Sequence, residues 1–457
     1  MKTIRLKKAK VNKSNDKMIT MPTVNPHAAG IDLGSKSHFV CVAQDNVKEF
    51  GVFTSDLHAI AAHLKSYGVK TVAIESTGFY WRSIYLILLD YGFEVFLVNA
   101  AHLKNVKGHK TDVVDSRWLQ LLHSIGLLSN SFQPDALTHE LRTYTRHRKN
   151  MITDASHLIS KMNKVLVLMN IQLHGVLRNI TGVSGLKVIR AILQGERDPK
   201  VLSSLVSLRA KASREDIEKA LTGDIRKEYL FELDQCFQLY NFYWQKIEEA
   251  DKQIEAWLKD HVSNMPPNDG YKKPKNKNRG TNDPTFNVGK YVHRISGGVE
   301  LLDINGVGSN TILTLVSETG LDMSKFPTAK HFASWLGFVP NRKVTGGREI
   351  SSHTRKKTNP LAKVIRDAAN STGNSKSKLG DFFRHLAYRK GRTAAIGATA
   401  RKIAVIIYKM LTEGKPYSYE YAQDQTEYMK VSKLKNILKT MDKFNISRDE
   451  LQLAWSM

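Results

Sequence analysis

Short apolar, β-rich runs alternate with amphipathic helical stretches between residues 28 and 100, and this alternation restricts the fold more than any other feature of the chain. Strands that are almost continuously hydrophobic are buried on both faces, which requires helices that cover the sheet. The order of the elements predicts an α/β domain with a mixed sheet. The predicted elements are a strand-rich run at 28–43 with a hairpin partner at 48–55, a helix at 56–67, a strand at 70–77, a helix at 81–92 and a strand at 93–100.

Two long helical stretches with hydrophobic seams follow from about residue 138. Their apolar residues recur at alternating short spacings, which is the pattern of a coiled coil. The seams predict coiled-coil helical arms that either pack together within one chain or join two protomers, and the sequence leaves both possibilities open. The first seam comprises Ile152, Ala155, Ile159, Met162, Leu166, Met169 and Leu173, and the second comprises Leu230, Leu233, Phe237, Tyr240, Trp244, Ile247, Ile254 and Leu258, interrupted by Asp251.

Composition divides the rest of the chain. Residues 265–290 are rich in lysine, asparagine, glycine and proline, which is typical of a flexible linker or of a loop that orders on a phosphate backbone. We expect six segments. They are a disordered basic arm at 1–26, the α/β domain at 27–137, a helical coiled-coil region at 138–262, a basic flexible linker at 263–293, a mainly helical C-terminal domain at 294–412 and a helical tail at 413–457.

Positive charge dominates the composition, with 69 lysines and arginines against 43 acidic residues and a formal net charge of +26 at pH 7. An anionic membrane surface or a nucleic acid would suit such a chain, and the distribution of the charge favours nucleic acid. The apolar runs are shorter than the roughly 20 residues of a membrane helix, and no apolar stretch follows the basic N-terminus. Only Cys41 and Cys236 are present, which excludes a disulfide framework. We therefore expect a soluble, cytoplasmic protein without a membrane partner.

Four carboxylates stand where the predicted elements bring them within reach of one another. Asp32 lies in the first strand, Glu75 ends a later strand, and Asp112 and Asp115 share one face of a probable helix start. Clustered carboxylates repel one another unless cations neutralise them, and the usual remedy is one or two divalent metals held by oxygen ligands. Each residue alone is better explained as a turn or capping residue, and only the ordered set of four favours a site. Lys110, just before the helix start, is a candidate phosphate ligand, although a solvated basic turn explains it equally well.

A short basic loop at 341–360 is a second candidate site. Such a density of cations suits contact with a nucleic-acid backbone and is favoured over the alternative of a solvated surface loop. The candidate phosphate-binding residues are Arg342, Lys343, Arg348, Arg355, Lys356 and Lys357.

These motifs together resemble one known family. The stretches GIDLGSKSHFV, ESTGFYW and VNAAHLKNVKGHKTDVVDS are similar to the DEDD-type insertion-sequence transposases, also known as bridge-RNA-guided recombinases. The stretches INGVGSNTILTLVSETG and FASWLGFVPNRKVTGGREISSHTRKKTNPLAKVIRDAANS resemble the C-terminal transposase domain of that family. The resemblance implies an N-terminal domain like the RuvC resolvase, with an RNase H-like fold.

The resemblance also implies a mechanism. Asp32, Glu75, Asp112 and Asp115 would be a Mg²⁺-binding catalytic quartet, and a serine before a glycine in the basic loop would attack DNA covalently. Thr345 occupies that serine's position here, in KVTGGRE. A threonine hydroxyl can act as a nucleophile, but its methyl group crowds the attack. Ser351 and Ser352 are the alternatives, and an impaired copy is a further one.

The family's partners would be donor and target DNA, a guide RNA from the noncoding flank of the element, and further copies of the chain in a dimer or tetramer. Three other functions compete with transposition. The motif GIDLG also resembles the phosphate loop of actin-like ATPases, but the sequence offers no convincing second phosphate hairpin or adenosine site. An architectural nucleic-acid binder would leave the four carboxylates unexplained. A junction-resolving nuclease of the RuvC kind would use the same carboxylates without a covalent step.

Overall fold

A computed structural model describes residues 22–43, 46–76, 78–99, 111–263, 265–266, 270–271, 280–351, 354, 359–419, 427–447 and 449–450. The chain divides into two compact units, a sheet unit at 1–133 and a helical unit at 134–457. The predicted boundary between the first two folded segments lies at 137/138, four residues beyond this division (137 − 133). Within the described residues, no helix is long and apolar enough to cross a membrane.

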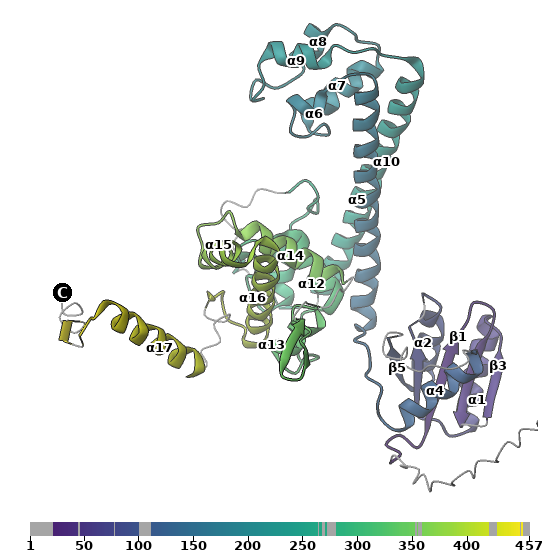
Figure 1. Ribbon diagram of the computed structural model, residues 1–457. Coiled ribbons are helices and arrows are strands. Elements are labelled where there is room, and N and C mark those ends of the chain that lie inside the picture. The colour runs from purple at the N-terminus through teal and green to yellow at the C-terminus, as the bar shows by residue number, and fades with distance from the viewer. Residues whose placement is uncertain are drawn as a thin grey trace, which may run out of the picture. The chain divides into compact units, whose positions relative to one another are not determined.

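The sheet unit is built on five strands in the order β3-β2-β1-β4-β5 (Figure 1). β1 pairs antiparallel with β2 and parallel with β4, so the predicted mixed sheet is confirmed. The elements are β1 (Ala28–Leu33), β2 (His38–Ala43), β3 (Asn46–Phe50), α1 (Thr54–Ser66), β4 (Thr71–Glu75), α2 (Trp81–Asp90), β5 (Glu94–Val98) and α4 (Asp112–Ser124).

Two details of the predicted strands were wrong. The apolar run at 28–43 contains two strands, because the chain turns after Leu33, where the Gly34 amide donates to the Ser37 carbonyl oxygen at 3.0 Å. The predicted hairpin partner at 48–55 ends early, since β3 stops at Phe50 and α1 already begins at Thr54.

Helices cover both faces of the sheet, and the period of two along each strand decides which residue meets which helix. Ala29, Ile31 and Leu33 of β1 join the core formed with α1 and α2. Ala73 of β4 belongs instead to a smaller cluster with Leu119 of α4. The sheet therefore separates α1 and α2 from α4.

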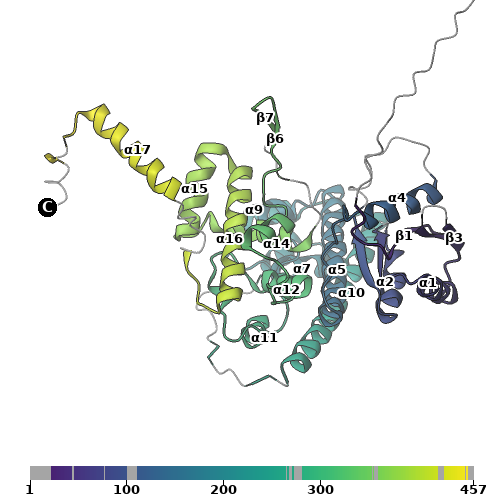
Figure 2. The same cartoon turned by 90° about the horizontal axis from the view of Figure 1, so that it is seen from below.

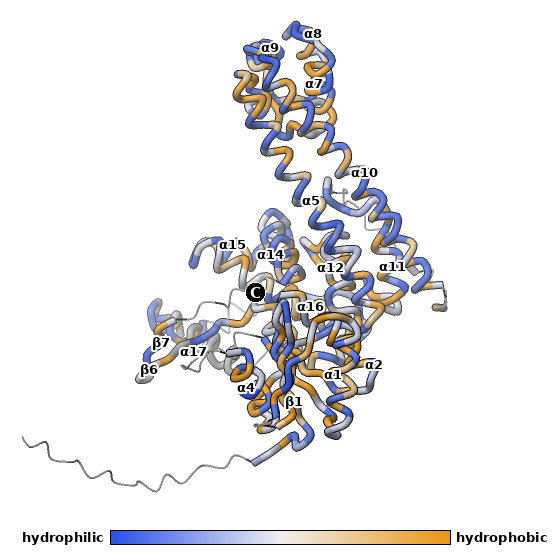
Figure 3. The backbone as a smooth tube through the Cα atoms, turned by 90° about the vertical axis from the view of Figure 1, so that its right-hand side faces the viewer, coloured by the Kyte–Doolittle hydropathy of each residue, from blue (hydrophilic) through white to orange (hydrophobic). Residues whose placement is uncertain are grey.

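The helical unit has two long helices, α5 (Ala136–Leu168) and α10 (Lys227–Ser263), which pack side by side (Figure 1). Hydrophobic and hydrophilic residues alternate along both (Figure 3), and seam residues such as Met162 and Phe237 share one core. The seams thus serve packing within the chain. Four short helices connect the long pair at one end: α6 (Leu173–Val176), α7 (Val183–Leu193), α8 (Pro199–Ser204) and α9 (Arg214–Leu221).

The rest of the helical unit is mainly helical, as predicted for its C-terminal part. α11 begins inside the segment predicted as a flexible linker, and the predicted basic loop contains a two-stranded hairpin. The elements are α11 (Val288–Ile295), η1 (Leu301–Asp303), α12 (Ser309–Thr319), α13 (Ala329–Trp335), β6 (Lys343–Thr345), β7 (Arg348–Ser351), α14 (Pro360–Thr372), α15 (Lys378–Lys390), α16 (Arg392–Glu413) and α17 (Glu427–Phe444).

Candidate functional sites

Two of the predicted acidic residues stand at the carboxyl ends of neighbouring strands. β1 and β4 are parallel and their register pairs Ile31 with Ile74, so Asp32 and Glu75 follow side by side one residue further on. Both isoleucines belong to the core shared with α1 and α2. Because side chains alternate between the faces of a strand, Asp32 and Glu75 point to the opposite face, which α4 covers.

Helix α4 lies very close to β1 because position 30 has no side chain. A Cβ atom on Gly30 would come within 2.4 Å of the Gln120 backbone nitrogen and 2.7 Å of the Ser116 carbonyl oxygen. The Gln120 side-chain amide also donates to the Ala28 carbonyl oxygen at 3.3 Å. α4 therefore runs back along β1, and its first turn lies towards the strand's carboxyl end, where Asp32 stands.

The first turn of α4 carries the other two acidic residues. Thr111 caps the helix, since its side chain accepts a hydrogen bond from the Val114 amide at 3.3 Å. Asp112 and Asp115 follow in that turn, where the partial positive charge of a helix N-terminus favours carboxylates. The cap thus fixes where α4 begins, and with it the placement of both carboxylates.

A buried histidine anchors the other end of α4. The His123 Nε2 atom lies 2.9 Å from Thr71 Oγ1 of β4, and burial lowers the pKa of His123 to about 4. His123 is therefore neutral at pH 7 and holds the helix against the sheet.

The four carboxylates influence one another electrostatically. The pKa of Asp32 is raised from 3.8 to about 6, first by burial and then by the charges of Glu75, Asp112 and Asp115, while a hydrogen bond from the Leu33 backbone opposes the shift. We call these four residues the acidic quartet. Their mutual repulsion is the cost of gathering like charges in one neighbourhood.

The quartet offers the ligands that a divalent metal takes, since carboxylate oxygens suit hard cations such as Mg²⁺. Within the described part of the chain, which includes all four residues, no three histidine, cysteine or acidic side chains are arranged to hold a metal ion. The chemistry of the donor set therefore fits a metal, while the side chains do not form a closed coordination shell.

Thr345 lies at the end of β6, next to a tight turn. Gly346 and Gly347 follow with φ angles of +55° and +76°, and the register pairs Thr345 with Arg348 of β7. Consecutive positive φ values are what a two-residue hairpin turn requires, and glycine adopts them without strain. Thr345 is exposed, and the hairpin extends away from the neighbouring helices (Figure 2).

The predicted phosphate-binding residues of the basic loop are only partly described. Arg342 makes an ion pair with Glu349 at 3.4 Å, and Arg348 is exposed. Only the backbone of Lys343 is described, and Ser351 ends β7. The other candidates, Lys110, Ser352, Arg355, Lys356 and Lys357, lie outside the described residues.

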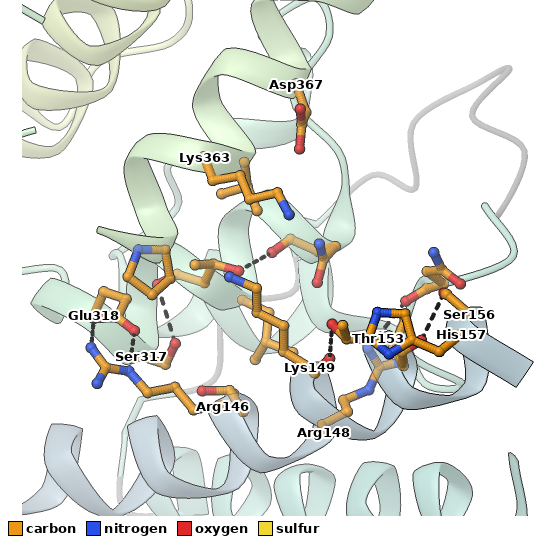
Figure 4. A pocket seen from close by; sticks show the side chains of 18 residues that line it. Arg146, Arg148, Lys149, Thr153, Ser156, His157, Ser317, Glu318, Lys363 and Asp367 are labelled. Carbon is orange, nitrogen blue, oxygen red and sulfur yellow. Dashed lines mark hydrogen bonds and ion pairs between the residues drawn. The ribbon is translucent and has the colours of Figure 1, made fainter. Parts of the chain in front are cut away.

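A cationic pocket that the sequence did not reveal opens between α5, α12 and α14 (Figure 4), with a volume of about 360 Å³. We call it the α5 pocket. Two of its arginines are paired with buried carboxylates, Arg146 with Glu318 through two contacts of 2.8 Å and Arg148 with Asp251 at 2.5 Å. The ionisable side chains that line it are Arg146, Arg148, Lys149, His157, Glu318, Lys363 and Asp367.

Comparison with known proteins shows similarity in two regions. Residues 29–171 match a DEDD family model described as a transposase, and residues 299–383 match a model described as the transposase IS116/IS110/IS902 family. The chain is also 27% identical over 119 residues to the transposase for insertion sequence element IS1111A of Coxiella burnetii (strain RSA 493 / Nine Mile phase I). That match covers 25% of the chain and 32% of the relative, so the similarity spans about a third of the relative's length.

The first matched region contains the mixed sheet and the whole acidic quartet, and the second contains the β6–β7 hairpin with Thr345. By these matches, the chain is similar to transposases in both regions. The family descriptions that it matches are those of the DEDD transposases and of the IS116/IS110/IS902 transposases.

Proposed function

We propose that this chain cuts and rejoins DNA as the transposase of an insertion sequence, with the acidic quartet as its metal-binding catalytic site. The single observation that carries the proposal is the placement of Asp32 and Glu75 at the ends of the paired strands β1 and β4, beneath a helix whose first turn carries Asp112 and Asp115. Burial and the charges of the other three residues raise the pKa of Asp32, which isolated capping or turn carboxylates would not do. The strand order with its central parallel pair supports an RNase H-like domain of the RuvC kind.

The two halves of the quartet are held by different elements. Asp32 and Glu75 are fixed by strand pairing, whereas Asp112 and Asp115 are fixed by a capped helix that Gly30 allows to lie close to the sheet. Mg²⁺ bound there would supply the positive charge that stabilises the phosphodiester oxygens during cleavage. The protein's own contribution is to hold its four carboxylates on one side of the sheet, facing the substrate.

The second catalytic element of this proposal is the Thr345 hydroxyl. Its Oγ1 atom would form a bond to phosphorus as the bond to the leaving strand end breaks, the hydroxyl proton would pass to solvent, and the leaving oxygen would take up a proton. Thr345 is exposed beside the two glycines of the hairpin turn, whereas Ser351 is half-buried, and this difference favours Thr345 over Ser351.

Further parts of the proposal rest on the family. Donor and target DNA would be the substrates, a guide RNA from the element's noncoding flank would select them, and a dimer or tetramer would combine the quartet of one chain with Thr345 of another. The net charge of +26 suits several strands of nucleic acid. The long helices α5 and α10 would act as coiled-coil arms between protomers, in addition to packing against each other.

Recombination between donor and target plasmids, with the flanking RNA supplied, tests this function. We expect Asp32→Ala and Glu75→Ala to reduce joining by about a thousandfold, since several kcal/mol of transition-state stabilisation are lost with the metal. Thr345→Ala should remove both joining and the covalent protein–DNA adduct, while Ser351→Ala, the matched control in the same hairpin, keeps both.

Other outcomes would contradict parts of the proposal. Normal joining by Asp32→Ala would refute the catalytic quartet. Normal joining by Thr345→Ala would move the nucleophile to Ser351 or Ser352. Cleavage without any trapped adduct in the wild-type protein would identify a junction-resolving nuclease instead.

A further inference from the structure

Two lysines from helices far apart in the sequence enter the α5 pocket from opposite walls. Lys149 extends from α5 and Lys363 from α14 into the space between the helices (Figure 4). Lys149 is half-buried and Lys363 is exposed. Their positive charges are close enough for Lys363 to lower the pKa of Lys149, although burial is the larger cause of that shift.

The other cations of the pocket are already neutralised. Arg146 is bound by the buried Glu318, and Arg148 is bound by the buried Asp251 and donates to the Asn282 carbonyl oxygen at 3.1 Å. Both arginines are therefore held in place by buried carboxylates, and Glu318 is shared between Arg146 and Arg142. They form a rigid frame around the two lysines.

The lysines have no such compensation. Among the residues that the structure describes, no ion pair or hydrogen bond engages either ammonium group, and the remaining acidic side chain of the pocket is Asp367. Lys363 and Arg146 lower the pKa of Lys149 whereas Glu318 and Asp367 raise it, and Lys363 has the largest effect of these four charges. The pocket thus keeps an excess of positive charge at its centre.

Two hydroxyl groups of the pocket donate their hydrogen bonds to the backbone of α5. The Thr153 hydroxyl donates to the Lys149 carbonyl oxygen at 3.1 Å and the Ser156 hydroxyl to the Ile152 carbonyl oxygen at 2.8 Å, both within α5. A ligand in the pocket would therefore meet two ammonium groups as its principal donors. Such a pair selects an anion with several acceptor oxygens.

We propose that the α5 pocket binds one phosphate group of the nucleic-acid strand on which the protein acts. A volume of about 360 Å³ lies within the roughly 300–1,000 Å³ of small-molecule sites, so the pocket accommodates a phosphate together with part of its sugar. A free phosphate ion shares the same chemistry and is the alternative source. The proposal rests on the proposed function only in taking nucleic acid as the substrate, and it does not involve the acidic quartet.

Equilibrium binding of a duplex DNA oligonucleotide at several salt concentrations tests this site, with EDTA present throughout. Each phosphate that the protein neutralises contributes about 0.9 to the slope of log affinity against log salt concentration. We expect Lys149→Met, Lys363→Met and the double variant to reduce the slope by about one. Lys164→Met, an exposed lysine on the same helix outside the pocket, is the matched control and should keep the wild-type slope.

A second arm identifies the source of the phosphate. Thermal unfolding with and without inorganic phosphate shows whether the free ion stabilises the wild-type protein more than the double variant. Loss of this stabilisation with an unchanged DNA slope would overturn the strand as the source and assign the pocket to free phosphate. Unchanged behaviour in both arms would overturn the phosphate site altogether.

These results are separable from the recombination experiment. Because Lys363 is exposed, Lys363→Met remains informative if Lys149→Met does not fold. If the lysine variants reduce the slope but the wild-type protein fails to recombine DNA, the phosphate site is supported and the proposed function is refuted. If the lysine variants keep the wild-type slope and the wild-type protein recombines DNA, the phosphate site is refuted and the proposed function is supported.

Discussion

The sheet unit and the helical unit each gather charge of one sign, but they treat it differently. At the end of β1 and β4, burial and the charges of three neighbouring carboxylates raise the pKa of Asp32. In the α5 pocket, two arginines are paired with buried carboxylates, whereas Lys149 and Lys363 make no ion pair with the residues that the structure describes. One region is short of positive charge and the other is short of negative charge.

The contrast indicates two kinds of ligand. A bound hard cation lowers the electrostatic energy of carboxylates that repel one another. A bound phosphate does the same for ammonium groups without an ion-pair partner. A phosphodiester substrate with its metal ions provides both charges. The uncompensated charges of the two units, which have opposite signs, therefore suit the same substrate. Each can be measured separately.

The largest effect is expected from the buried ion pair beside the α5 pocket. Asp251→Ala leaves Arg148 buried without its partner, which costs about 3–5 kcal/mol in the free energy of unfolding. Glu249→Ala on the same helix removes an exposed partner of Lys246 and should cost less than about 1 kcal/mol. Denaturant unfolding of both variants measures the difference, and equal losses would show that Arg148 does not depend on Asp251.

A medium effect is expected when Mg²⁺ meets the acidic quartet. At ten times its dissociation constant, a bound ion stabilises the native state by about 1.4 kcal/mol. Thermal unfolding with and without Mg²⁺ should show this gain in the wild-type protein and little of it in Glu75→Gln. A gain of the same size in Glu75→Gln would place the ion elsewhere.

The smallest effect is expected from Asp32→Asn in EDTA. The Asp32 pKa is raised from 3.8 to about 6 on folding, so the native state holds an extra proton between these values and its carboxylate destabilises the fold above about pH 6. The asparagine variant should therefore be more stable at pH 8, by about 1 kcal/mol after allowance for solvent screening, and no more stable at pH 4. Glu49→Gln, exposed on β3, is the control for removing one negative charge. A gain that persists at pH 4 would contradict this origin.

The sequence predicted the sheet and the places of Asp32 and Glu75, because apolar runs that end in a polar residue identify buried strands. It did not predict the hairpin at Thr345, although two glycines between β-branched and charged residues are a known hairpin signal. The basic character of that segment hid it. Lys149 and Lys363 could not be recognised, because only the packing of α5 against the C-terminal helices makes them neighbours.

Asp251 is another residue whose contacts could not be predicted from the sequence. In the sequence it is an interruption of a hydrophobic seam. In the structure it binds Arg148 and also accepts from the Thr285 backbone amide at 2.9 Å. A seam pattern contains no information about a partner on a different helix, so the polar residue could be noticed but not explained.

Gly30 determines how closely α4 approaches β1, although it has no functional group of its own. Any side chain at this position would have to push the backbone of α4 away from β1, because the atoms it would meet are main-chain atoms that cannot rotate aside. The displaced helix would carry Asp112 and Asp115 with it and leave Asp32 and Glu75 where they are. The absence of a side chain at position 30 thus sets the distance between the two pairs of acids. A substitution there would alter the geometry of the site while all four carboxylates remained present.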